Sequence, residues 1–183
     1  MRLFIGLMPN PALRREAAEY AAYFSARMPG KYVEPDNFHI TLAFLGEVAE
    51  EAVPAVERCM NEAAARVWPF VYSIQGVNAF GKPERGILHL TVRDSGETAR
   101  AATLLREALS KENLPFDPKP LCAHITLARN VRYSPQALPS LPREASGANG
   151  FTLYHSTRVS DALKYIPIRF SAFTAPSETP DRP

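Results

Sequence analysis

One pentapeptide, His-Ile-Thr-Leu-Ala, occurs twice in this chain, first at His39 and again 85 positions later at His124. Each copy lies in an apolar run rich in β-branched residues, a pattern typical of a β-strand. Side chains alternate between the two faces of a strand, so His39 and Thr41 share one face. His124 and Thr126 share a face for the same reason, and the isoleucine and leucine of each copy point into a core. The repeat therefore predicts two equivalent strands, each with a polar pair opposite an apolar back.

The similarity between the two halves of the chain extends beyond the pentapeptide. Apolar runs of β type at residues 2–7 and 87–92 are each followed by a segment whose apolar residues are spaced three and four apart, as in an amphipathic helix, and then by the motif strand. The spacing to the motif histidine is 34 residues in both halves, counted from Ile5 and from Leu90. We infer a duplicated strand–helix–strand unit rather than a chance match of five residues.

The remaining segments indicate an α+β protein. Further strands are predicted at 70–77, 151–156 and 165–173, the last two as a hairpin, with further helices at 52–67 and 134–138 and loops at 80–86 and 146–150. A length of 183 residues suits one domain, or two small lobes that share a core. We expect a single domain over residues 1–175, followed by a disordered, proline-rich tail at 176–183.

Composition excludes several classes of protein. With 46% hydrophobic and 22% charged residues, the chain has the make-up of an ordinary globular protein. The formal net charge of +2 permits a phosphate-bearing ligand but is far from that of a protein that coats a nucleic-acid duplex. Two cysteines cannot form a disulfide framework, the apolar N-terminal run is too short for a signal peptide, and no apolar run reaches membrane-spanning length. We expect a cytoplasmic protein that does not associate with membranes.

The two histidines suggest acid–base chemistry at phosphorus. The unperturbed pKa of histidine, about 6.5, allows one imidazole to accept a proton while the other donates one. Such a pair suits an in-line displacement, in which a base deprotonates the attacking oxygen and an acid protonates the leaving oxygen. Thr41 and Thr126 are placed to donate hydrogen bonds to the phosphoryl oxygens. Arg129 could add a charge-assisted bond, but strict alternation puts it on the opposite face from His124, so a bend or bulge is needed.

Other types of site fit the sequence less well. A zinc site needs three or four ligands, and the chain contains no His-x₃-His or Cys-x₂-Cys pattern. A serine hydrolase is disfavoured because no Gly-x-Ser-x-Gly sequence occurs. His89 and His155 are interpreted as structural, since a lone histidine on a strand is more often packed or exposed than catalytic. Phe80 and Tyr154 could stack on a nucleobase, although packing is the commoner role of such residues.

These motifs resemble the 2H phosphoesterase superfamily and, more narrowly, its RNA 2′,3′-cyclic phosphodiesterase branch, historically called the 2′-5′ RNA ligase family. The resemblance is carried by residues 2–7, 37–46, 80–83, 124–129 and 153–156. It implies a bilobal α+β fold of two pseudo-symmetric halves, with antiparallel sheet, helices and a central cleft that holds both His-x-Thr pairs. It implies no metal and no other cofactor. The chain departs from the family pattern at Ala123, where proline is usual, and at residues 161–163, where a glycine-containing turn is usual. A tryptophan is also usual ahead of the first motif, and here Tyr32 is nearest.

The same resemblance implies hydrolysis of a 2′,3′-cyclic phosphate at an RNA end to a 2′-phosphate. His39 would be the proton donor to the leaving 3′ oxygen and His124 the proton acceptor that activates water, while Thr41 and Thr126 hold the phosphate. Run in reverse with a 5′-hydroxyl nucleophile, the chemistry would form a 2′-5′ linkage. The expected partner is RNA with a cyclic phosphate end, or a cyclic nucleotide, and the protein is expected to be a monomer.

Two other functions remain compatible with the sequence. A non-catalytic RNA- or nucleotide-binding module would keep the cleft without turnover, although two intact histidines argue against it because binding alone does not require both. A related 2H activity would cleave 2′-5′ oligoadenylate or a cyclic ADP-ribose derivative. A panel of substrates distinguishes these functions, and the sequence alone does not.

Overall fold

The computed structural model describes residues 1–134 and 145–174. Its strands are β1 (Arg2–Leu7), β2 (Lys31–Tyr32), β3 (Ile40–Glu47), β4 (Phe70–Lys82), β5 (Arg85–Arg93), β6 (His124–Val131), β7 (Ala145–Ala148), β8 (Gly150–Val159) and β9 (Ala162–Ala172). Its α-helices are α1 (Pro11–Ser25), α2 (Val53–Ala64) and α3 (Glu97–Lys111), with 3₁₀ turns at Pro35–Asn37 and Glu50–Ala52. The predicted tail at 176–183 and nearly all of the predicted helix at 134–138 lie outside the described residues.

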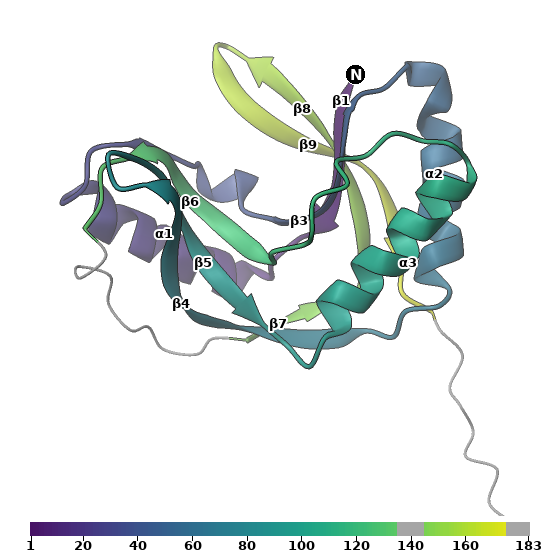
Figure 1. Cartoon of the computed structure of the whole chain (residues 1–183), viewed down its shortest axis with the longest axis horizontal. Coiled ribbons are helices and arrows are strands. Elements are labelled where there is room, and N and C mark those ends of the chain that lie inside the picture. Colours follow the sequence, from purple (N-terminus) through teal and green to yellow (C-terminus); the bar gives the residue numbers. More distant parts are fainter. Residues whose placement is uncertain (135–144, 175–183) are drawn as a thin grey trace, which may run out of the picture.

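The strands form one curled antiparallel sheet, in the order β7-β4-β5-β6-β3-β1-β8-β9, with β2 added beside β6 (Figure 1). The two motif strands, β3 and β6, meet at the centre of this order and pair antiparallel at Ile40 and Ile125. Three further strands extend outward from each of them, so an approximate twofold axis passes through the isoleucine pair. The α+β prediction with two pseudo-symmetric halves is therefore confirmed, and the repeated pentapeptide lies where the halves join.

The helices of the two repeats pack on opposite halves of the sheet. Helix α1, which follows β1 in the chain, contacts β6 and β7, whereas α3, which follows β5, contacts β3. Helix α2 packs against α3 and also contacts β8 and β9 (Figure 1). Each strand–helix–strand unit thus places its helix on the half of the sheet that holds the motif strand of the other unit. The two halves are interlocked, and this fixes the two motif strands relative to each other.

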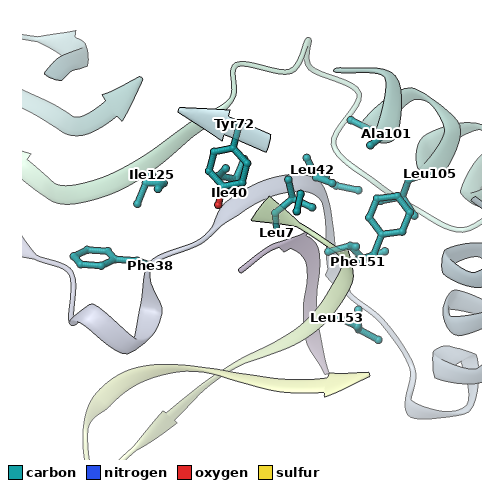
Figure 2. Packing of buried hydrophobic residues seen from close by; sticks show 14 of the residues in the cluster. Leu7, Phe38, Ile40, Leu42, Tyr72, Ala101, Leu105, Ile125, Phe151 and Leu153 are labelled. Atoms are coloured by element: carbon teal, nitrogen blue, oxygen red, sulfur yellow. The ribbon is translucent and has the colours of Figure 1, made fainter. Parts of the chain in front are cut away.

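Local sequence accounts for the start of α1 and for the core beneath the motif strands. The Asn10 side chain accepts a hydrogen bond of 2.8 Å from the Leu13 backbone N–H, and Pro11 occupies the first helical position, as predicted for a capped helix. Figure 2 shows Ile40, Leu42 and Ile125 among the buried hydrophobic side chains, and all three are fully buried. Burying a side chain of this size contributes about 1.5–3 kcal/mol. The apolar back of each motif therefore holds its polar pair in place.

The structure corrects three details of the sequence-based expectations. Residues 80–86 are not a loop, because β4 and β5 continue to a two-residue turn at Pro83 and Glu84. Residues 145–148 form strand β7 rather than a loop, since they pair with the edge of β4. Leu7 pairs with Ile40 and Leu90 pairs with Ile125, so Leu7 and Leu90 are the equivalent positions of the two repeats. They lie 33 and 35 residues before their partners, so the equal spacing of 34 counted from Ile5 and Leu90 does not join equivalent positions.

The hairpin predicted near the C-terminus is confirmed, although its strands are longer than expected. Strands β8 and β9 pair along their whole length and are joined by Ser160 and Asp161. Both turn residues have positive φ, 48° and 64°, which is the conformation of a type I′ turn. Aspartate tolerates this conformation better than most side chains do, so the hairpin forms without the glycine that is usual in the family.

Candidate active site

His39 lies immediately before β3 and is held at both ring nitrogens. Its Nδ1–H donates to the Asn37 carbonyl oxygen at 2.7 Å, which leaves Nε2 to accept from the Thr41 hydroxyl at 3.0 Å. The ring packs against Phe4 and Tyr165, with centroids 4.5 and 5.0 Å away. Burial lowers the pKa of His39 to about 4, the Asn37 carbonyl opposes this, and the positive charges of His124 and Arg129 lower it further. The imidazole is therefore neutral near pH 7 in the unliganded protein.

His124, the first residue of β6, has the same main-chain anchor but different neighbours. Its Nδ1–H donates to the Cys122 carbonyl oxygen at 2.7 Å, so each motif histidine binds the carbonyl two residues before it. Its ring contacts His89 and Phe80, with centroids 5.2 and 4.9 Å away. Burial is the main cause that lowers the pKa of His124, with a smaller contribution from Arg129, and the Cys122 carbonyl acts in the opposite direction. In both histidines Nε2 is the ring nitrogen that the main-chain anchor leaves, and in His39 it accepts from Thr41.

The pairing of the motif strands brings the four predicted side chains together. The motif strands β3 and β6 have one registered pair, Ile40 with Ile125, so His39 and His124 each lie one residue from the point where the two strands meet. The electrostatic effect of His124 on His39 agrees with this proximity. The two imidazoles and the two hydroxyls therefore belong to residues on either side of the point where the motif strands meet.

A β-bulge brings Arg129 onto the same face. Thr126 pairs with His89, and the next registered pair is Ala128 with Leu88, so Leu127 is an extra residue in β6. The extra residue reverses the alternation beyond it and puts Arg129 on the face of His124 and Thr126. This is the bulge that the sequence-based assignment of Arg129 required. Arg129 lies close enough to lower the pKa of both motif histidines.

An equivalent bulge in β3 has a different outcome. Thr41 pairs with Gly6, and the next registered pair is Ala43 with Ile5, so Leu42 is the extra residue. Phe44 is thereby brought onto the face of His39 and Thr41, at the position that corresponds to Arg129 in the other half. The two halves share a backbone irregularity that presents an arginine in one case and a phenylalanine in the other.

A cavity of about 640 Å³ opens on the His39 side of this face. Its lining consists of Met1, Arg2, Phe4, His39, Thr41, Phe44, Glu47, Arg129, His155, Ser156, Thr157, Arg158, Leu163 and Tyr165. His124 and Thr126 are not part of the lining, so the cavity extends from the motif of β3 toward the β8–β9 hairpin. Its size is that of a typical small-ligand site, and it combines aromatic rings, hydroxyls and arginines.

Three residues next to the motif histidines support the site by packing or hydrogen bonding. His89, interpreted as structural, is buried, and its ring stacks on Phe80 with a centroid distance of 3.9 Å. The ring of His89 also contacts His124. Tyr154 is also buried and stacks on Phe4, so packing is its role rather than contact with a base. Asn37 supplies the carbonyl that orients His39. In the sequence, only the position of Asn37 two residues before His39 could have indicated this role. The partners of its side chain lie far away in sequence.

This fold and site place the chain among the 2H phosphoesterases, and comparison with known proteins defines the family. The pattern of the LigT-like phosphoesterases matches residues 7–89. The RNA 2′,3′-cyclic phosphodiesterase of Archaeoglobus fulgidus is 33% identical over 151 residues, which cover 82% of this chain and 84% of the relative. The protein of the same name from Escherichia coli is 26% identical over 185 residues, which cover 94% of this chain and 97% of that relative.

The fold agrees with that relationship. The crystal structure of TT0787 of Thermus thermophilus superimposes with a TM-score of 0.81 at 25% identity and covers 96% of this chain and 99% of that one. The chain belongs to the LigT-like phosphoesterase family and is an enzyme that hydrolyses phosphoric esters. In the described part of the chain, no helix has the length and apolar character needed to cross a bilayer.

Proposed function

We propose that this enzyme hydrolyses the 2′,3′-cyclic phosphate at an RNA end to a 2′-phosphate, using His39 and His124 as an acid–base pair. The observation that carries the proposal is the convergence of both imidazoles, both threonine hydroxyls and Arg129 on one face at the join of the two repeats. The names of the relatives from Archaeoglobus fulgidus and Escherichia coli, RNA 2′,3′-cyclic phosphodiesterase, support the choice of substrate.

The position of the cavity supports His39 as the proton donor. In an in-line displacement, the attacking water lies opposite the leaving 3′ oxygen, which the ribose carries. The cavity that can hold a nucleoside opens on the His39 side of the motif pair. His39 would then protonate the 3′ oxygen, while His124, on the side away from the cavity, takes the proton from water. General acid–base catalysis of this kind is worth about 10²–10⁴-fold for each positioned group.

Because His39 has a low pKa in the unliganded protein, the proposed mechanism needs the negative charge of the substrate to protonate it. A donor must be protonated, yet burial keeps this imidazole neutral near pH 7. An opposite charge within about 4–6 Å favours the protonated form by about one to three pKa units. The phosphodiester anion would supply that charge. Binding of the substrate is therefore expected to be accompanied by uptake of a proton at His39.

The hydrogen bond between His39 and Thr41 favours this change. In the neutral state, the Thr41 hydroxyl donates to Nε2 of His39. Once Nε2 is protonated it becomes a donor, so the hydroxyl hydrogen of Thr41 can turn to a phosphoryl oxygen. Thr126 would bind another phosphoryl oxygen, and Arg129 would add a charge-assisted bond of about 1.5–3 kcal/mol. Protonating the acid and binding the phosphate thus become one event.

The experiment is hydrolysis of an oligoribonucleotide with a 2′,3′-cyclic phosphate end in the presence of EDTA, with the product followed by ³¹P NMR. We expect a 2′-phosphate, formed without added metal; within residues 1–134 and 145–174, no group of three or more His, Cys, Asp or Glu side chains is arranged to hold a metal ion. Saturable binding without product would identify a binding module instead. Turnover of 2′-5′ oligoadenylate or a cyclic ADP-ribose derivative alone would identify a related 2H activity.

Four further expectations belong to the same proposal. The reaction run with a 5′-hydroxyl oligonucleotide would form a 2′-5′ linkage, which the same assay can detect as an acyclic phosphodiester signal that replaces the signal of the cyclic phosphate. The enzyme would act as a monomer in the cytoplasm and need no cofactor. Sedimentation tests the monomer, cell fractionation tests the location, and the EDTA arm tests the requirement for metal.

A further inference from the structure

We propose that the end of the cavity formed by the β8–β9 hairpin binds the phosphodiester on the 5′ side of the reacting nucleotide, with Arg158 as its cation. This inference rests on the proposed function, because it takes the cyclic phosphate to lie between His39 and His124. It adds a second phosphate site and assigns the enzyme to oligonucleotide ends rather than to free cyclic nucleotides.

The cavity is longer than the site of the reaction. It runs from His39 and Thr41 to Thr157 and Arg158 near the hairpin turn. Tyr154 pairs with Phe4, whose ring touches His39, and Arg158 lies four residues further along β8. Four residues of strand span about 13 Å. Arg158 therefore serves a group beyond the phosphate held by the motif pair, at the level where an RNA chain would continue.

The charge at this end of the cavity is uncompensated. Arg158 donates from Nη1 to the Asp161 carbonyl oxygen at 2.9 Å, a bond that orients the guanidinium without neutralising it. Within residues 1–134 and 145–174, no carboxylate lies within ion-pair distance of Arg158. By contrast, Arg2 faces Glu47 at 3.8 Å and lies over the Phe44 ring. A free guanidinium at a cavity end is a site for phosphate, which it can bind through two parallel N–H groups.

The hairpin that carries Arg158 is fixed relative to the reacting centre by Asn37. The Asn37 amide donates to the Leu163 carbonyl oxygen at 2.8 Å, and its oxygen accepts from the Tyr165 N–H at 2.9 Å. The main-chain oxygen of the same residue orients His39. One buried side chain thus joins β9 to the loop before β3, so the second phosphate site is held at a constant distance from the first.

The chemistry of the lining selects the class of ligand. Next to Arg158 the cavity is lined by the hydroxyl-bearing residues Ser156 and Thr157, with the aromatic ring of Tyr165 nearer to His39. An aromatic surface followed by hydroxyls and a cation suits a base and then a backbone phosphate. A nucleoside 2′,3′-cyclic phosphate has no phosphate on its 5′ side and leaves this end empty. A chain of two or more nucleotides fills it.

The experiment compares kcat/KM for a trinucleotide with a 2′,3′-cyclic end and for the corresponding nucleoside 2′,3′-cyclic phosphate. We expect the wild type to prefer the trinucleotide, and Arg158→Gln to reduce that preference about tenfold or more, as for the loss of one charged hydrogen bond. The slope of log(kcat/KM) for the trinucleotide against log salt concentration should become shallower by about 0.7. Arg158→Lys, which retains the charge, should keep most of the salt slope.

Lys164→Gln is the matched control. Lys164 pairs with Thr157 across the same hairpin but does not line the cavity, so this variant loses the same charge and should keep the trinucleotide preference. An equal fall for both substrates in Arg158→Gln, or an equal effect of Lys164→Gln, overturns the second phosphate site. A wild type without preference for the trinucleotide does the same. A wild type that hydrolyses neither substrate overturns the proposed function and this inference with it.

Discussion

The His39 half and the His124 half of the site have the same local geometry and different surroundings. In both, Nδ1 binds the carbonyl two residues earlier, and a leucine bulge follows the threonine. His39, however, lies among aromatic rings at the wall of a cavity, whereas His124 lies against a third histidine and away from it. In the proposed mechanism, the features common to both halves would orient the reacting atoms. The features that differ would contact the substrate.

This difference matches the asymmetry of the proposed substrate. A cyclic phosphate has a nucleoside on one side and an attacking water on the other, so a symmetric site would serve neither well. At the two equivalent bulges, Phe44 and Arg129 both border the cavity, but only Arg129 brings a charge, which lowers the pKa of both motif histidines. The duplication therefore supplies two similar backbone supports, and in the proposed mechanism Phe44 would contact the nucleoside while Arg129 would contact the phosphate.

Replacing either motif histidine should have the largest effect. His39→Asn and His124→Asn are each expected to lower kcat/KM by about 10²–10⁴-fold, because each removes a positioned acid or base. The double variant should lose little more than the worse single variant, since an acid and a base in one step act as a unit. Steady-state kinetics on the three variants test this, with thermal unfolding as the control for folding. Losses that multiply in the double variant would show that the two histidines act independently.

Arg129 should come next, because the bulge of β6 presents this cation where the equivalent bulge of β3 presents Phe44. Arg129→Gln is expected to lower kcat/KM by about 10–100-fold, as for the loss of a charged hydrogen bond. It should also raise the pKa of both His39 and His124, since the charge of Arg129 lowers both. Arg132→Gln, on the same segment but outside the cavity lining, is the control. An unchanged histidine titration by NMR in Arg129→Gln would contradict the assigned position of Arg129.

Asn37 and Cys122 occupy equivalent positions and test whether the His39 half alone depends on a distant contact. Asn37→Ala leaves the Leu163 carbonyl and the Tyr165 N–H without their partner, which should lower the free energy of unfolding by about 1–3 kcal/mol. Cys122→Ala keeps the carbonyl that binds His124 and should leave stability within about 0.5 kcal/mol. Urea unfolding of both variants gives the comparison. Equal losses would mean that Asn37 does not tie the hairpin to the site.

The sequence was sufficient to predict those parts of the site that depend on local pattern. The faces of His39, Thr41, His124 and Thr126 follow from alternation within one strand. The cap of α1 follows from its first residues, and the α+β class follows from the order of the segments. Each of these properties depends on residues within a few positions of one another, so periodicity and capping chemistry are enough.

Other features depend on partners that are distant in sequence. The bulges at Leu42 and Leu127 exist because of the register with β1 and β5, and the sequence around Arg129 showed only that a bulge was needed. Strand β7 has no strand-like pattern and forms because the edge of β4 is available to pair with it. The contacts of Asn37 lie 126 and 128 positions away. Sequence periodicity carries no information about such pairings.

The smallest expected effect concerns His89, the neighbour that distinguishes the surroundings of His124. Burial lowers the pKa of His89 to about 4, the Ile87 carbonyl opposes this, and the charge of His124 lowers it further. At pH values between about 6.5, the pKa of His89 in the unfolded chain, and about 4, its pKa in the native protein, the unfolded chain binds a proton that the native protein does not. The free energy of unfolding should therefore fall as the pH is lowered through this window, and above it His89 should have no such effect. His89→Phe, which keeps a ring next to Phe80, should show a smaller fall.

Urea unfolding at about pH 7.5 and pH 5 measures the fall in the free energy of unfolding for the wild type and for His89→Phe. Adding a ligand then distinguishes the contribution of His39 from that of His89. His39 also has a pKa near 4, so it should contribute to the same window in both proteins. Because His39 lines the cavity and His89 does not, inorganic phosphate should raise the pKa of His39. The contribution of His39 to the fall in the free energy of unfolding should then decrease, while the contribution of His89 should stay the same. An equal fall in stability in the wild type and His89→Phe would mean that His89 is protonated in the native state. His89 would then add a positive charge next to His124 at pH 5, which the low pKa of a buried His89 excludes.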